Sequence, residues 1–351
     1  MQDEYGTMDD SGHTYSLIGY KLESGIELPE LNIRYKTFGT LNDTKNNAVV
    51  VCHALTGNAS LEDWWGTMLG PGRPFDTQKY FIICANVIGS CYGSTGPLSI
   101  NPNTGKRYGN TFPDVTIRDT VQAHLEMTRE DLGINSIHAV IGGSLGGMQA
   151  LEWALIGGAF VKKAVVIGCG AEHTAWQIGI SEVQRQCIYA DEKWNSGNVD
   201  MSDPPTKGLR LARQQAMISY RTAKAYHQKF GRRRADSPED SGHFEVRKYL
   251  EYQGLKFHKR FDAVSYVKLT EQMDSHDVGR GRGGLAQALD SISAEVLVVG
   301  IDSDMLYPIH EQEALAKAIP GARLRVIQSN EGHDGFLLEQ KQLSAIIDEF
   351  L

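Results

Sequence analysis

Residues 136–148 have the sequence Ser136-Ile137-His138-Ala139-Val140-Ile141-Gly142-Gly143-Ser144-Leu145-Gly146-Gly147-Met148, and this stretch decides the fold of the chain. Its first half is an apolar run that predicts a buried strand, and the residues after the serine favour a helix. Between them lies a G-x-S-x-G pattern. A strand, a glycine-flanked serine and a helix are typical of a nucleophile elbow, where glycines avoid clashes at a sharp turn. Ser144 is therefore predicted at the carboxyl end of a strand, over a helix N-terminus whose dipole favours negative charge.

Buried strands alternate with helices on both sides of this stretch. Alternation predicts strands at 14–22 and 31–38, and further strands are predicted at 47–53, 80–87, 161–168, 294–301 and 323–328. Helical spacing and capping residues predict helices at 116–132, 147–155, 310–318 and 340–350. The glycine- and proline-rich segment 88–113 is expected to be a long functional loop. This alternation predicts an α/β fold with a mostly parallel central sheet covered on both faces.

The pattern changes between about Ala171 and Leu289, where the chain is helical in character and poor in strands. Helix-like spacing covers 176–190, 207–230 and 244–253, with polar breaks at 195–205 and 233–242. We therefore expect one α/β core made of residues 1–170 and 290–351, interrupted by a helical cap at 171–289.

The composition excludes several classes of protein. The 351 residues are 41% hydrophobic and 22% charged, with a formal net charge of −8, which argues against a nucleic-acid binder. The five cysteines are odd in number and form no CxxC pair, which favours free thiols and a reducing, cytoplasmic location. The polar, acidic stretch 1–12 is not typical of a targeting peptide, and no apolar run approaches the roughly 18 residues of a membrane span.

A nucleophilic serine needs a base, and the base needs an acid that orients it. In sheets with this elbow, the chain order is serine, then acid, then histidine, each just past the end of a strand. His333 follows the strand predicted at 323–328 and is our candidate base. Asp302 and Asp304 both follow the strand at 294–301, and spacing alone does not choose between them.

The reaction also needs donors for a developing oxyanion. One donor should be the backbone N–H that follows the nucleophile, at Leu145, and the other should come from the loop after an early strand. His53-Ala54-Leu55-Thr56-Gly57 is that loop, and the N–H of Leu55 is the predicted donor.

Motifs for other chemistries do not occur in the sequence. There is no G-x-G-x-x-G opening a helix after a strand, no G-x-x-x-x-G-K-[ST], no H-E-x-x-H, and no Cys/His spacing suited to zinc. We therefore expect no bound metal and no permanently bound cofactor, and we disfavour a dehydrogenase, a P-loop enzyme or a zinc enzyme.

The sequence resembles homoserine O-acetyltransferases of the α/β-hydrolase superfamily over nearly its whole length, and among them the fungal branch most. The motifs that carry the resemblance are Cys52-His53-Ala54-Leu55-Thr56-Gly57, Asp63-Trp64-Trp65, Gly89-Ser90, Gly96-Pro97, Tyr108-Gly109, Phe112-Pro113, Thr116-Ile117-Arg118-Asp119, the elbow through Met148, Gln184-Arg185-Gln186, Gly208-Leu209, Ala212-Arg213, Tyr220-Arg221, Ser303-Asp304 and Glu331-Gly332-His333-Asp334.

The resemblance implies roles that the residues alone do not. It selects Asp304 over Asp302 as the acid. It implies that Arg213 and Tyr220 hold the homoserine carboxylate, that Asp334 holds the ammonium, and that Thr56 lines the site. Many family members have Met at the position of Leu145, a change of little consequence because only the backbone N–H is used.

The implied activity is transfer of an acetyl group from acetyl-CoA to L-homoserine, a step of methionine biosynthesis, by a ping-pong mechanism through an acyl-serine. The helical cap would exclude water and so favour transfer over hydrolysis. The implied partners are these two small molecules and a second copy of the chain in a homodimer, with no nucleic acid or membrane. The triad does not separate this activity from acetylation of L-serine or deacetylcephalosporin C, from use of succinyl-CoA, or from a plain serine esterase. A non-catalytic binding module would have a broken triad, whereas Ser144, Asp304 and His333 are all present.

Overall fold

The computed structural model describes residues 12–235 and 242–351. The N-terminal stretch considered for targeting signals and most of the predicted polar break at 233–242 lie outside these residues.

Within the described residues, eight strands form one sheet in the order β1-β2-β4-β3-β7-β8-β9-β10. Their bounds are β1 (His13–Lys21), β2 (Glu27–Phe38), β3 (Ala48–Cys52), β4 (Phe81–Ala85), β7 (Ile137–Gly143), β8 (Val161–Ile167), β9 (Glu295–Ile301) and β10 (Arg323–Ile327). The strand β2 is antiparallel to both of its neighbours, and all pairs from β4 to β10 are parallel. The predicted mostly parallel sheet is therefore confirmed, with an antiparallel hairpin at one edge.

Alternate residues of each central strand enter two different apolar clusters, because successive side chains of a strand point to opposite faces. Val50 and Val166 pack on one face, which is covered by α2 (Ile117–Glu126), α3 (Leu145–Gly157), α9 (Leu285–Asp290) and α10 (Ile309–Ala318). Val51 and Val165 pack on the other face, under α1 (Leu61–Trp64), α11 (Gly335–Leu338) and α12 (Gln340–Phe350). Burial on both faces explains why these strands are continuous apolar runs rather than alternating ones.

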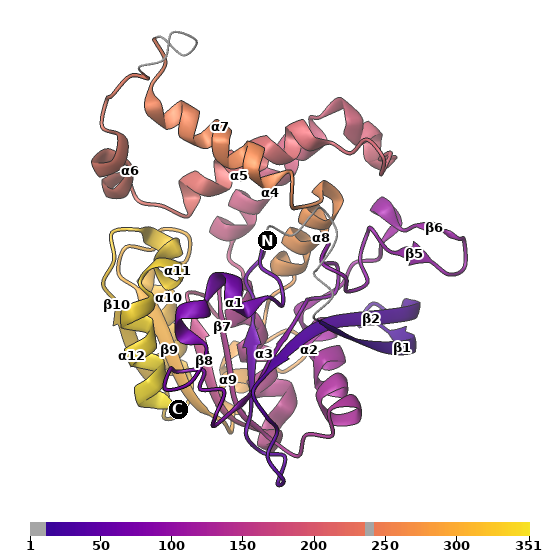
Figure 1. The fold of residues 1–351 in the computed structure, drawn as a ribbon, viewed down its shortest axis with the longest axis vertical. Helices are drawn as coiled ribbons and strands as arrows, with labels where there is room; N and C mark the ends of the chain where they lie inside the picture. Colours follow the sequence, from indigo (N-terminus) through magenta and orange to yellow (C-terminus); the bar gives the residue numbers. More distant parts are fainter. Residues whose placement is uncertain (1–11, 236–241) are drawn as a thin grey trace.

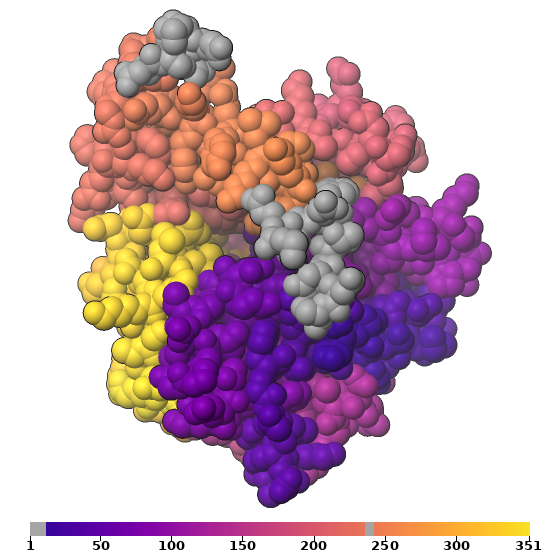
Figure 2. All heavy atoms as spheres, in the orientation of Figure 1, coloured from indigo at the N-terminus to yellow at the C-terminus, as the bar shows by residue number. Residues whose placement is uncertain are grey.

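The insertion between β8 and β9 is helical. It contains α4 (Ala175–Tyr189), α5 (Thr206–Ser219), α6 (Ala223–Phe230), α7 (Glu245–Phe257), α8 (Ala263–Asp274) and α9. Figure 1 shows α4 to α8 gathered above the carboxyl ends of the strands, and Figure 2 shows this layer overhanging the core. The helix α9 packs against α10 of the core instead. The cap boundaries 171–289 stay a prediction.

Three predicted elements differ from the structure. The segment 207–230 was expected to be continuous, but it is two helices, because the Thr222 side chain caps α6 by accepting a hydrogen bond from the N–H of Ala225 at 2.9 Å. The helix predicted at 116–132 is α helical only to Glu126 and continues as a π-helix, Met127–Asp131. The loop 88–113 contains a two-stranded sheet of β5 (Ile100–Asn101) and β6 (Lys106–Arg107).

Short 3-10 turns complete the described elements. They lie at Gly66–Met68, Gly109–Thr111, Gly158–Phe160, Glu192–Gly197 and Gly332–Asp334. All five cysteines are free thiols, and all but Cys187 are buried. In the part of the chain that the structure describes, every helix is too short or too polar to cross a lipid bilayer.

Candidate active site

The turn from β7 into α3 forms the predicted elbow. Ser144 has φ 58° and ψ −123°, a backbone conformation that is costly for a residue with a side chain. Both pattern glycines are sterically required: a Cβ on Gly142 would lie 2.1 Å from the carbonyl oxygen of Gly146, and a Cβ on Gly146 would lie 2.1 Å from that of Cys52. The sequence folds this way locally because only glycine allows strand, turn and neighbouring strand to approach so closely.

The structure brings Asp304, and not Asp302, to His333. His333 Nδ1 donates to Asp304 Oδ2 at 2.6 Å, and both side chains are buried. The other oxygen, Oδ1, accepts from the backbone N–H groups of Leu306 at 2.8 Å and Tyr307 at 2.9 Å. Asp302 has a different contact, since its Oδ1 accepts from the N–H of Ser329 at 2.9 Å and thereby joins the loops after β9 and β10.

Ser144 and His333 lie on either side of the end of β8. The N–H of Ser144 donates to the carbonyl of Ile167 at 2.9 Å. A Cβ on the next residue, Gly168, would lie 3.5 Å from His333 Cε1. On the other side, Phe336 packs with its ring centroid 5.4 Å from that of His333 and directly against Gly143. Ser144 is 6% exposed and His333 is 4% exposed, so both residues are largely shielded from solvent.

Burial and the neighbouring carboxylates shift the pKa of His333 in opposite directions. Burial lowers the pKa of the imidazole, but the charge of Asp304, its hydrogen bond and the charge of Asp334 together raise that pKa above the ordinary value of 6.5. The hydrogen bond to a carboxylate places the proton of a neutral ring on Nδ1, so that Nε2 can accept a proton from a hydroxyl.

The predicted oxyanion donors lie on two adjacent segments, the loop after β3 and the first turn of α3. Cys52, at the end of β3, pairs with Gly142 at the end of β7, so the loop that carries Leu55 starts beside the elbow. The buried side chain of Gln149 joins the two segments, because its Nε2 lies 3.3 Å from the carbonyl oxygens of both His53 and Leu145. The N–H of Leu145, at the first position of α3, has no acceptor within its own helix.

His53 supports the same loop as a neutral residue. Its Nδ1 lies 2.8 Å from the carbonyl oxygen of Ala54, and its Nε2 accepts from the N–H of Val87 at 3.2 Å. Burial lowers the pKa of His53 to about 4. Thr56 follows Leu55, and its carbonyl accepts from Arg260 at 2.8 Å.

Tyr220, at the end of the cap helix α5, packs beside the histidine, and Arg213 of α5 lies beside Tyr220. The Tyr220 ring centroid is 5.9 Å from that of His333, and Arg213 Cζ lies 5.8 Å from the centre of the Tyr220 ring. Arg213 Nε is buried without a hydrogen-bond partner among the residues that the structure describes. A buried guanidinium nitrogen with no partner is suited to an anionic ligand, above all a carboxylate.

Asp334 already has a cationic neighbour that the sequence did not suggest. Arg221 Nε lies 2.8 Å from Asp334 Oδ2, and the same guanidinium contacts Glu331. Burial raises the pKa of Asp334, while Arg221, Arg213 and His333 counteract this rise. Arg221 belongs to the Tyr220-Arg221 motif, so the motif was visible in the sequence although this role of Arg221 was not.

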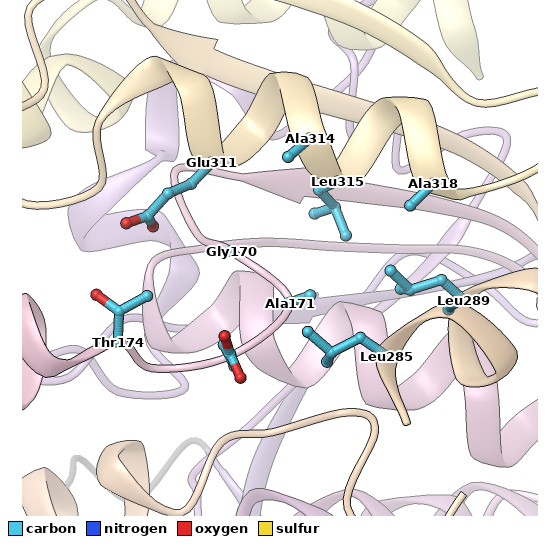
Figure 3. A pocket seen from close by; sticks show the side chains of 11 residues that line it. Gly170, Ala171, Thr174, Leu285, Leu289, Glu311, Ala314, Leu315 and Ala318 are labelled. Atoms are coloured by element: carbon cyan, nitrogen blue, oxygen red, sulfur yellow. The ribbon is translucent and has the colours of Figure 1, made fainter. Parts of the chain in front are cut away.

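A separate cavity lies away from these residues. Figure 3 shows it between α9, α10 and the segment 170–174, with Leu285 and Leu289 facing Ala314, Leu315 and Ala318. Its volume is about 360 Å³, and no predicted site residue lines it. No group of His, Cys, Asp and Glu suited to a metal ion occurs among the described residues.

Three comparisons with known proteins show which proteins this chain is similar to. The sequence profile of the alpha/beta hydrolase fold family matches residues 47–340. A homoserine O-acetyltransferase of Salinibacter ruber is 49% identical over 330 residues, 93% of each chain. The crystal structure of a homoserine O-acetyltransferase from Bacillus anthracis has a TM-score of 0.88 at 26% identity, covering 97% of this chain and 96% of that chain. An acetylester hydrolase from Corynebacterium glutamicum has a TM-score of 0.84 at 27% identity, covering 96% and 95% of the two chains.

Proposed function

The chain belongs to the homoserine O-acetyltransferases of the α/β hydrolase family, and we propose that it transfers an acetyl group from acetyl-CoA to the hydroxyl of L-homoserine through an acyl-serine on Ser144. The narrower resemblance to the fungal branch stays a prediction. In this proposal Ser144 is the nucleophile, His333 the base and Asp304 the orienting acid. Leu55 and Leu145 supply the oxyanion donors.

The first half-reaction acylates the serine. His333 Nε2 takes the proton of Ser144 as Oγ attacks the thioester carbonyl, and the two backbone N–H groups stabilise the oxyanion. The carbon–sulfur bond then breaks, and His333 returns the proton to the thiolate of CoA. In the second half-reaction, His333 deprotonates the acceptor hydroxyl, which attacks the acyl-serine carbonyl. The bond from that carbon to Ser144 Oγ then breaks, His333 returns the proton to Oγ, and the ester is released.

Arg213 Nε, which is buried without a hydrogen-bond partner among the described residues, is the observation that carries the choice of an amino-acid acceptor. A plain esterase needs no cation one aromatic ring away from its base, whereas homoserine brings a carboxylate that such a cation can bind. Tyr220 would orient that carboxylate and Thr56 would line the site. Asp334 would receive the substrate ammonium beside Arg221.

A plain esterase is the second candidate, and the likeness to an acetylester hydrolase favours it. The deciding experiment supplies acetyl-CoA or succinyl-CoA with homoserine, serine or deacetylcephalosporin C, and measures free CoA and product mass. We expect O-acetylhomoserine and CoA release well above hydrolysis. CoA release that no amino-acid acceptor increases would contradict the transferase proposal.

The acyl-serine has its own test. After mixing with acetyl-CoA and no acceptor, the intact mass of the protein should increase by one acetyl group. The Ser144→Ala variant should show no increase, and its turnover should fall by about 10⁴-fold or more. An acetylated Ser144→Ala protein would place the nucleophile elsewhere.

The proposal extends to the surroundings of the enzyme. We assign it to the cytoplasm because its five cysteines are free thiols, as expected in a reducing compartment. We also propose a homodimer, since apolar side chains at helical spacing are exposed on α4 and α5. These side chains are Trp176, Val183, Leu211 and Ile218.

A further inference from the structure

The loop that carries Asp304 is held by the first turn of the cap. Three side chains at residues 173–177 make hydrogen bonds to three consecutive residues of this loop. Trp176 Nε1 donates to the carbonyl of Met305 at 2.8 Å, Gln177 Nε2 donates to the carbonyl of Leu306 at 2.9 Å, and His173 Nε2 lies 3.0 Å from the hydroxyl of Tyr307. The cap therefore binds the segment directly after the acid.

The bond from His173 to Tyr307 is buried, as is the bond from Gln177 to Leu306, and it alone of the three reaches a side chain of the loop. His173 Nδ1 lies 3.0 Å from Asp274 Oδ1, and Asp274 Oδ2 accepts from Arg185 at 2.6 Å. The ring of His173 is thus hydrogen-bonded at both nitrogens, to a cap carboxylate at Nδ1 and to the Tyr307 hydroxyl at Nε2. Tyr307 is fully buried and His173 is 6% exposed, so water does not readily replace this bond.

Tyr307 contacts both partners of the Asp304–His333 pair. Its backbone N–H donates to Asp304 Oδ1, and its ring centroid is 5.1 Å from that of His333. A change in the position of Tyr307 would therefore move a donor that holds the acid and a ring that packs on the base.

Packing does not hold the His173 segment from both sides. Gly170, Ala171 and Thr174 line the cavity of Figure 3, across from Glu311, so empty space borders this segment on that side. Hydrogen bonds to the 305–307 segment then carry more of the positioning than they would in a close-packed interior.

We propose that His173 is a positioning residue: through the hydroxyl of Tyr307 it holds Asp304 and His333 in the geometry that activates Ser144. Since Arg185 and Asp274 lie on the cap helices α4 and α8, the network couples that geometry to the placement of the cap. The inference depends on the proposed roles of Ser144, His333 and Asp304, but not on which acceptor is used.

The test is a double-mutant cycle of Tyr307→Phe, which removes only the hydroxyl, and His173→Leu. The first readout is the rate at which a fluorophosphonate labels Ser144, followed by intact mass, because this reaction needs an activated serine but no acyl acceptor. The second readout is kcat and KM with acetyl-CoA and homoserine.

We expect each single variant to lose about 10-fold in labelling rate and in kcat, with both KM values within about 2-fold of wild type. The double variant should be no slower than the slower single variant, because both changes break the same bond.

His276→Leu is the matched control. His276 is also buried, but its Nε2 lies 3.1 Å from the carbonyl oxygen of Gly170 and makes no bond to the 305–307 segment. The His276→Leu variant should have a lower midpoint of thermal unfolding, while its rate of Ser144 labelling stays within about 2-fold of wild type. Tyr307→Phe labelling at the wild-type rate overturns the inference, as does additive slowing in the double variant or equal slowing in His276→Leu. A wild-type protein that is not labelled at Ser144 overturns the proposed function as well, which separates the two failures.

Discussion

At the scale of single residues, the proposed roles imply that the protonation of His333 sets the pH range in which Ser144 is nucleophilic. The charge and hydrogen bond of Asp304 outweigh burial and raise the pKa of His333 above 6.5. Since the base must be neutral, activity is lost as the pH falls through that raised pKa, and the acid limb of kcat/KM should lie above pH 6.5. In Asp304→Asn, burial then dominates, so the limb should move to lower pH while kcat falls by about 10⁴-fold.

Asp302→Asn is the control for this pH profile. Asp302 contacts the N–H of Ser329 and not His333, so this variant should keep the wild-type acid limb even if the loop is less stable. An acid limb that moves in Asp302→Asn but not in Asp304→Asn would exchange the two roles.

Arg213 should act on the acceptor and not on the donor. We expect Arg213→Ala to raise the KM for homoserine by about 10- to 100-fold, the value of a charge-assisted hydrogen bond, with little change in the KM for acetyl-CoA. The KM for homoserine of Arg213→Lys should lie between those of the wild type and of Arg213→Ala, because lysine keeps the charge but lacks the planar guanidinium. Steady-state kinetics at fixed co-substrate measure this. An equal rise in both KM values would contradict the carboxylate role.

At the scale of elements, the elbow depends on the absence of a single methyl group. A Cβ on Gly146 would meet backbone atoms of β3, which do not move aside as a flexible side chain would. We expect Gly146→Ala to cost at least about 3 kcal/mol of unfolding free energy or to prevent folding. Gly179→Ala is the matched control: among the residues that the structure describes, no neighbour outside α4 lies within 4 Å of the new Cβ, so the variant should be more stable by about 0.5–1 kcal/mol. Urea unfolding checks both, and a neutral Gly146→Ala would refute the steric account.

The central strands of the sheet could be predicted because they are buried on both faces, so that their sequences are mostly continuous apolar runs. The cap helices carry weaker signals. Val264, Tyr266, Val267 and Leu269 of α8 are all buried, so this helix lacks the one-sided apolar spacing by which helices are found. The end of α5 was missed because Thr222 looks like any helical threonine until its side chain is seen capping α6.

In the candidate site as well, some residues could be predicted from the sequence and others could not. Ser144 could be predicted because the elbow is a local steric pattern, and His333 because of its order and place after a strand. The ion pair of Arg221 with Asp334 joins the end of a cap helix to the loop after β10, far apart in sequence, and each residue alone resembles an ordinary surface charge. The hydrogen bond between His173 and Tyr307 could not be predicted for the same reason.

At the scale of the whole molecule, the exposed apolar side chains of α4 and α5 are the surface through which we expect the proposed homodimer to form. Trp176 and Val183 are seven residues apart on α4, and Leu211 and Ile218 are seven apart on α5, so each pair lies on one helix face, with exposed fractions of 44–57%. We expect Val183→Asp with Leu211→Asp to weaken a dimer by at least about 100-fold, measured by sedimentation velocity. Ile18→Asp, on the edge strand β1 and 81% exposed, should leave the dimer intact. Dissociation by Ile18→Asp alone would place the interface on the sheet edge.

The position of the cap within the chain has a consequence for biosynthesis. The cap is inserted between β8 and β9, so Ser144 precedes it, whereas Asp304 and His333 follow it. A ribosome therefore completes the nucleophile first, then the whole cap, and only afterwards the acid and the base. Under the roles proposed above, a nascent or truncated chain exposes the serine without the histidine that activates it. The order of translation would thus protect cellular thioesters from hydrolysis by an enzyme whose water-excluding cap is still incomplete.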